Sequence, residues 1–103
     1  MKRIEIFANV SVRETLFDAF TRRGVARRFT LIPTVHGSGS SGPRFGDEVW
    51  PEENFMLIVY CPDQEAEGIR GAVAEVKAAF ENEGVTLFEV DAWGGRRRSP
   101  QGK

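Results

Sequence analysis

The sequence predicts an α+β domain in which a four-stranded antiparallel sheet carries two helices on one of its faces. Four apolar segments have the length and composition of strands, and two amphipathic segments have helical spacing. Their order along the chain is strand, helix, strand, strand, helix, strand. Two strand–helix–strand units that interleave in one sheet give the ferredoxin-like arrangement, and 103 residues suffice for one such domain.

The first strand is expected over residues 2–10, where apolar and other residues alternate. Ser11 and Glu14 have the spacing of a capping box, in which each side chain accepts a hydrogen bond from the backbone N–H of the other residue. A helix is therefore expected over residues 12–23, and Gly24 stands where a left-handed C-terminal cap is expected.

Two further strands are expected over residues 26–35 and 55–61. Pro33 has no N–H to donate to a strand ladder, so the first of these strands must lie at an edge or contain a bulge there. The second is apolar or aromatic throughout, which is typical of a strand that is buried on both faces.

The second helix is expected over residues 65–82, with Gly68 and Gly71 weakening its first half and Gly84 closing it. The last strand then covers residues 85–93. The domain as a whole is expected to span residues 1–93, with a long loop at 36–53 and a basic, disordered tail at 94–103.

The face of the sheet opposite the helices is expected to be apolar. The third strand contributes apolar residues to both faces, and Phe7, Phe88 and Val90 add to the second face. A large apolar face on a water-soluble domain marks an interface, so an oligomer packed through its sheets is expected. The alternative is that the long loop or the tail folds over the sheet.

Charge and cysteine content narrow the class of protein. The net charge is −1, but four basic residues follow Trp93, which leaves −5 for residues 1–93. An acidic body argues against nucleic acid as a partner, because phosphate contact needs a basic surface. Cys61 is the one cysteine and cannot form an internal disulfide, so a cytoplasmic location is expected.

Several short motifs resemble those of the nitrogen-regulatory P-II-like superfamily. They are the opening KRIEIF, the glycines of Val35-His36-Gly37-Ser38-Gly39 that lead into a long loop, and Pro62-Asp63 after the third strand. The resemblance covers about residues 2–93 and implies a homotrimeric regulatory protein that is not an enzyme. It also implies ligand clefts between subunits and a T-loop, residues 44–53, that contacts a protein target, which by family analogy can be a membrane protein.

The sequence departs from the family pattern where the family binds its ligands. The segment Asn82-Glu83-Gly84 lacks the lysines that hold ATP phosphates in P-II proteins. Ser40 or Ser41 stands where the family has the glutamine that holds magnesium and 2-oxoglutarate. These differences argue against ATP and 2-oxoglutarate as ligands. They predict a divergent member that binds another small anion or a protein partner.

Two segments are candidate anion sites. Free backbone amides and hydroxyls could form an anion-binding nest in the run Gly37, Ser38, Gly39, Ser40 and Ser41. Such a run is equally typical of a flexible linker. Arg96 and Arg97 in the tail could bind phosphates, or could belong to a solvated tail.

The loop also carries candidate partner contacts, which are Arg44, Phe45 and Trp50. A tryptophan among charged residues can anchor a protein partner. Alternatively, Trp50 folds back over the sheet.

A divalent metal is the alternative ligand, because His36 stands at the entrance of the loop and carboxylates or Cys61 could complete its ligand set. That reading makes the chain similar to the CutA family of metal-binding proteins. No arrangement of residues points to a catalytic site. The third strand lacks the basic and aromatic signature of an RNA-recognition sheet.

Overall fold

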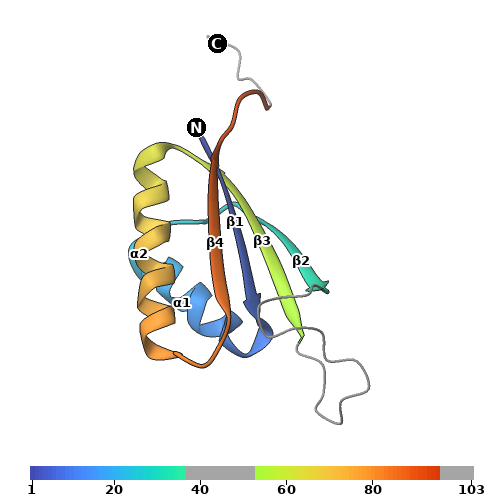
Figure 1. Cartoon of the computed structure of the whole chain (residues 1–103). Helices are drawn as coiled ribbons and strands as arrows, with labels where there is room; N and C mark the ends of the chain where they lie inside the picture. Colours follow the sequence, from blue (N-terminus) through green and yellow to red (C-terminus); the bar gives the residue numbers. More distant parts are fainter. Residues whose placement is uncertain (37–52, 96–103) are drawn as a thin grey trace.

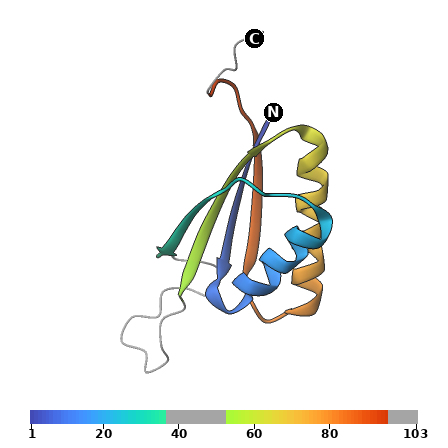
Figure 2. The same ribbon diagram turned by 180° about the vertical axis from the view of Figure 1, so that it is seen from behind.

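The computed structural model describes residues 1–36 and 53–95. The helices and strands are, in chain order, β1 (Lys2–Asn9), a 3-10 turn η1 (Val10–Val12), α1 (Arg13–Arg23), β2 (Thr30–Val35), β3 (Asn54–Cys61), α2 (Asp63–Ala79) and β4 (Val85–Asp91). The strands form one antiparallel sheet in the order β2-β3-β1-β4. Both helices lie on the same side of this sheet (Figure 1), and the view from behind shows the same two layers (Figure 2). The predicted ferredoxin-like fold is confirmed.

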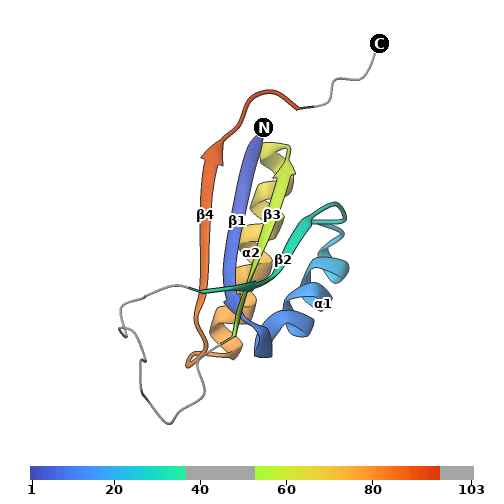
Figure 3. The ribbon, with the colours of Figure 1, turned by 90° about the vertical axis from the view of Figure 1, so that its right-hand side faces the viewer.

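The core lies between the sheet and the helices. Strand residues of one parity face the helices and are buried: Ile4, Ile6, Ala8, Phe55, Leu57, Val59, Cys61 and Val85. The helices complete the core with Leu16, Ala19, Phe20, Ala66, Ile69, Ala72, Val73 and Val76. Because the side-chain period of a strand is two, residues of the other parity form a second face that no helix covers. Figure 3 looks onto this face, with α2 behind the strands.

The start of α1 differs from the prediction. The carboxamide of Asn9 accepts a hydrogen bond from the N–H of Ser11 at 2.9 Å, and this contact turns the chain into η1. The N-cap of α1 is Val12, and no side chain caps the helix there. The predicted capping box between Ser11 and Glu14 is therefore wrong, because Asn9 competes for the same amide.

The end of α1 follows the prediction. Gly24 adopts the left-handed conformation with φ of 65°, and its N–H donates to the carbonyls of Phe20 and Thr21. Ala26 also has a positive φ, 55°, and its N–H donates to the carboxylate of Glu65 at 2.8 Å. These turns occupy the residues that the sequence assigns to the beginning of a strand, so β2 starts only at Thr30.

Pro33 has the place that its chemistry requires. β2 is an edge strand, and its pairing with β3 shifts register between Ile32 and Val35, the segment that contains Pro33. The regular ladder is interrupted where Pro33 cannot donate a hydrogen bond, as the sequence predicts.

The two glycines of α2 allow α1 and the following loop to approach closely. A Cβ at position 68 would lie 2.8 Å from Cγ1 of Val25, whereas one at position 71 would meet the guanidinium of Arg23. The glycines that weaken the helix in sequence terms therefore make room for packing. α2 also ends at Ala79, and its C-cap is Phe80 rather than a residue near Gly84.

We expect Gly68→Ala to lower the free energy of unfolding by about 1–2 kcal/mol. Alanine gains helix propensity of about 1 kcal/mol, but overpacking against the stiff Val25 side chain costs about 1–3 kcal/mol. Urea denaturation measures the difference. Gly71→Ala is the matched control, because the flexible end of Arg23 can move aside. A Gly68→Ala variant as stable as Gly71→Ala would contradict the close packing.

An ion-pair cluster joins the two helices. Arg22 and Arg23 of α1 both donate to the carboxylate of Glu75, the latter with Nη2 at 3.2 Å from Oε1. Hydrogen bonds from Arg22, and then from Arg23, lower the pKa of Glu75. Because the folded pKa is the lower one, the cluster stabilises the fold above the unfolded-state pKa. This contribution disappears as pH falls through the folded pKa.

Replacing Glu75 by Gln should therefore reduce the free energy of unfolding near pH 7 and have little effect near pH 3, about the range over which such a carboxylate titrates. Urea denaturation at a series of pH values measures this convergence. Glu81→Gln is the control, since Glu81 pairs with no other described residue. A stability difference that stays constant across this pH range would mean that the charge of Glu75 does not stabilise the fold.

Candidate functional site

The uncovered face of the sheet, called the open face below, carries several apolar side chains. Its exposed apolar residues include Phe88, which is 54% exposed, Val90 and Ile32. Met56 and Ile58 of β3 are half-buried on the same face. The rings of Phe7 and Phe88 meet edge to face, with centroids 6.2 Å apart. The apolar face expected from the sequence is present in the described residues.

A polar group of three residues interrupts the open face. Nε of Arg3 donates to Glu5 at 2.7 Å, and Nη1 of Arg3 donates to the hydroxyl of Tyr60 at 2.6 Å. Its guanidinium also lies over the ring of Tyr60, 5.5 Å from the centroid. These contacts, first with Glu5 and then with Tyr60, raise the pKa of Arg3. The charges of Arg3 and Glu5 are thus paired within the chain.

At one end of the sheet, beside the last residues of β3, the surface is hollowed. This arginine hollow has a volume of about 340 Å³. It is lined by Gly24, Arg27, Arg28, Tyr60, Pro62 and Glu65. Three elements meet there: the loop after α1, the end of β3 and the start of α2.

The backbone of the loop after α1 determines where the arginines lie. Gly24 reverses the chain, and the Ala26 amide is tied to Glu65 at the start of α2. Arg27 and Arg28 follow directly and are exposed. Their position over the hollow therefore depends on a contact between residues 39 positions apart in the sequence.

The arginine hollow has the chemistry of an anion site. Among the described residues, neither Arg27 nor Arg28 forms an ion pair, while Glu65 already accepts the N–H of Ala26. A guanidinium binds carboxylates and phosphates through two parallel hydrogen bonds, and it remains charged at any physiological pH. The hollow also offers the ring of Tyr60, so it combines positive charge with an aromatic surface.

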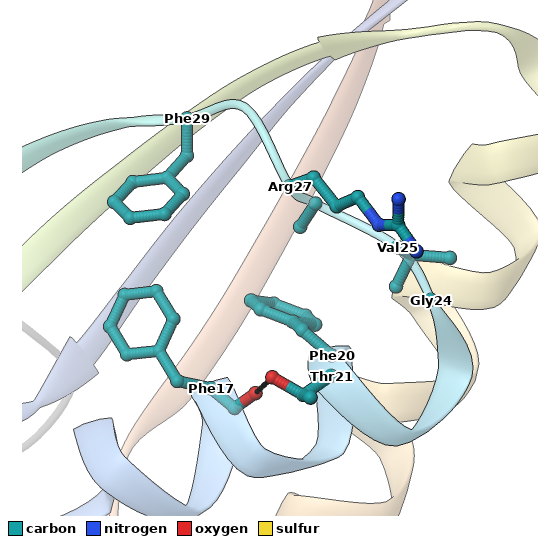
Figure 4. Close-up of a pocket in the computed structure, with 8 residues that line it drawn as sticks. Phe17, Phe20, Thr21, Gly24, Val25, Arg27 and Phe29 are labelled. Carbon is teal, nitrogen blue, oxygen red and sulfur yellow. Dashed lines mark hydrogen bonds between the residues drawn. The ribbon is translucent and has the colours of Figure 1, made fainter.

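A second hollow lies on the other side of the same loop (Figure 4). This phenylalanine hollow has a volume of about 290 Å³ and is lined mainly by the rings of Phe17, Phe20 and Phe29, with Val25 and Arg27 beside them. The rings of Phe17 and Phe29 have centroids 5.1 Å apart, and those of Phe17 and Phe20 are 6.1 Å apart. Arg27 lines both hollows.

Most site residues predicted from the sequence lie outside the described residues. These are Gly37, Ser38, Gly39, Ser40, Ser41, Arg44, Phe45, Trp50, Arg96 and Arg97. His36 is described and is exposed directly after β2. Trp93, the last side chain before the glycines of the tail, is 98% exposed.

Metal ligands do not gather in the described part of the chain, where no three of the His, Cys, Asp and Glu side chains are close enough to share an ion. The assignment of His36 as a ligand stays a prediction. Cys61 is a free, buried thiol. Burial, and then the carboxylates of Glu65 and Glu89, raise its pKa, so this thiol is a poor nucleophile.

The sequence contained one signal for the arginine hollow that was not used. Arg27 and Arg28 are adjacent and follow a glycine that ends a helix, in a short connection between helix and strand. Connections of this kind often carry binding residues. Their neighbours Tyr60 and Pro62 could be found only from the fold.

No protein-family model and no curated protein sequence matches the chain. Its structure is similar to CPII, a nitrogen regulatory PII-like protein from Thiomonas intermedia K12 bound to ADP, AMP and bicarbonate. The TM-score is 0.68 at 23% identity, with 92% of each chain covered. The apo form of CPII matches with a TM-score of 0.55 at 21% identity, over 86% of this chain and 87% of that chain.

A third similar structure is a protein from Thermus thermophilus that is described as PII-like in signalling. Here the TM-score is 0.63 at 24% identity, over 90% of this chain and 87% of that chain. Neither described helix is long and apolar enough to cross a membrane. The chain has the fold of the nitrogen-regulatory PII-like proteins, with a sequence that has diverged far from theirs.

Proposed function

We propose that this chain is a regulatory protein of the PII-like type that forms a homotrimer and binds a small anion in the arginine hollow. Its role is to signal rather than to catalyse. The observation that carries the proposal is the pair Arg27 and Arg28, which no described acidic group neutralises, at a hollow that also offers the ring of Tyr60. CPII, which shares the fold, is bound to ADP, AMP and bicarbonate, all of them anions.

The ligand class that fits best is an adenine nucleotide with few phosphates, such as ADP or AMP. An adenine ring can stack on an arginine or a tyrosine, while the second guanidinium binds phosphate. The short segment Asn82-Glu83-Gly84 offers no lysine for a longer phosphate chain. ATP is therefore expected to bind more weakly than ADP.

The open face supports the trimeric assembly. Phe88, Val90 and Ile58 present apolar surface that water solvates poorly, and burying it against other copies stabilises an oligomer. Arg3 and Glu5 can enter the interface because each already has a partner in its own chain. In a ring of three copies, the edge of each sheet lies beside the next copy, so that ligand clefts form between subunits.

The loop at residues 36–53 would present the state of the ligand site to a protein partner, which by analogy with the family can be a membrane protein. It joins β2 to β3, the strand whose other end lines the arginine hollow. The free thiol of Cys61 is in keeping with a reducing, cytoplasmic compartment.

Native mass spectrometry of the purified protein, with and without ADP, tests the proposal. The expected species has three times the 11.5 kDa mass of the chain and takes up one ADP per chain. A variant that lacks residues 40–52 should remain trimeric and lose the protein partner. A monomer that takes up no ADP would refute both the assembly and the ligand.

A further inference from the structure

The basic residues of the domain are gathered on one side. The segment formed by α1 and its following loop, residues 13–28, contains five arginines and only two acidic residues. The remaining described residues contain four basic and ten acidic residues. One helix and its loop are thus positive on an otherwise negative domain. Glu75 of α2 reduces this charge only at Arg22 and Arg23.

The phenylalanine hollow lies within this basic segment. Phe29 is 44% exposed at its mouth, an unusual position for an aromatic residue, and Phe17 stacks obliquely against it. A cavity of about 150 Å³ suffices for a benzene molecule, so a hollow of about 290 Å³ has room for an indole or phenyl ring. Arg27 stands at the rim with a guanidinium that no described residue pairs.

We propose that the phenylalanine hollow is a docking site for an acidic peptide segment of a partner protein, with one aromatic side chain as its anchor. An anchor ring that fills a desolvated aromatic pocket supplies most of the binding energy of such a contact. The surrounding arginines attract the acidic residues beside the anchor and fix their register. This site is separate from the ligand site of the proposed function.

Charge complementarity is what selects this occupant. A second copy of the chain is negative over most of its described surface outside residues 13–28, but it would have to offer an aromatic side chain flanked by acids at the contact. A small anion would gain nothing from three phenylalanine rings. An acidic segment with an aromatic anchor satisfies both the rim and the walls of the hollow.

The probe for this proposal is a fluorescein-labelled peptide with one tryptophan between two runs of three glutamates. Fluorescence anisotropy at low salt should show saturable binding to the full-length protein. Phe29→Ala and Arg27→Glu should each weaken this binding at least about tenfold, as expected for an anchor pocket and its charged rim. A peptide with alanine in place of the tryptophan should bind at least about tenfold more weakly.

The controls separate the site from its surroundings. Trp93→Ala removes an exposed aromatic residue elsewhere, and Lys77→Glu reverses an exposed charge on α2, so both variants should bind the peptide like the wild type. Arg28 lines only the arginine hollow, so Arg28→Glu should abolish ADP binding and weaken the peptide less than Arg27→Glu does.

Three results would overturn the proposal. The first is no binding of the peptide at concentrations up to about 1 mM, the weak end of specific affinities. The second is equal affinity of the Phe29→Ala variant, confirmed as folded by its thermal melting, and the wild type. The third is a change of oligomeric mass in Phe29→Ala, which would mean that another copy of the chain covers the hollow.

Discussion

Phe88→Asp is expected to convert the trimer into monomers that remain folded. Phe88 is more than half exposed in the single chain, so the aspartate is solvated and costs the monomer little. In the trimer the same side chain would be an unpaired carboxylate in an apolar contact, which costs several kcal/mol per ion. Threefold symmetry repeats this cost at every copy.

Native mass spectrometry and thermal melting measure the two parts of this expectation. Ala74→Asp on the exposed side of α2 is the matched control and should leave the assembly trimeric. A Phe88→Asp protein that still forms trimers would show that the open face is not the interface. It would leave folding of the loop or the tail over the sheet as the explanation for this face.

Arg28→Glu is expected to lower the affinity for ADP at least about tenfold. A hydrogen bond to a charged group contributes about 1.5–3 kcal/mol, and about 1.4 kcal/mol corresponds to a factor of ten in affinity. The substituted carboxylate also repels phosphate. Isothermal titration calorimetry measures the effect, and Lys77→Glu controls for the general change in charge.

Arg28→Lys refines the interpretation. Lysine keeps the charge but loses the planar pair of donors, so an intermediate affinity is expected if Arg28 binds phosphate directly. Unchanged affinity in Arg28→Glu would place the nucleotide elsewhere. The assembly could then still be a PII-like trimer, but the arginine hollow would not be its ligand site.

The order and type of the elements could be predicted because each depends on local periodicity. β1, β3 and α2 show this most clearly, since alternation or helical spacing continues through their length. Gly24 and Pro33 were correctly interpreted because their backbone chemistry limits what the chain can do.

The errors have long-range or competing causes. The beginning of α1 was wrong because Asn9, in the preceding strand, takes the amide that Ser11 was expected to help cap. The beginning of β2 was wrong because Ala26 is held by Glu65 from another helix. No local pattern contains that contact.

The candidate site was harder to predict than the fold. The arginine hollow joins Arg27 and Arg28 to Tyr60 and Pro62, which are far away in the sequence, so only the packed domain brings them together. The residues expected to bind ligand or partner fall mainly in two segments, 37–52 and 96–103, that lie outside the described residues. Their roles remain predictions.

The burial of Cys61 gives the protein an internal reporter of its conformational opening. The thiol is 2% exposed in the central strand β3, and burial also keeps it in the unreactive protonated form. An alkylating reagent can reach it only when β3 separates from the helices. The rate of labelling at this single cysteine therefore measures how often the core opens, and a ligand that stabilises the closed state should slow it.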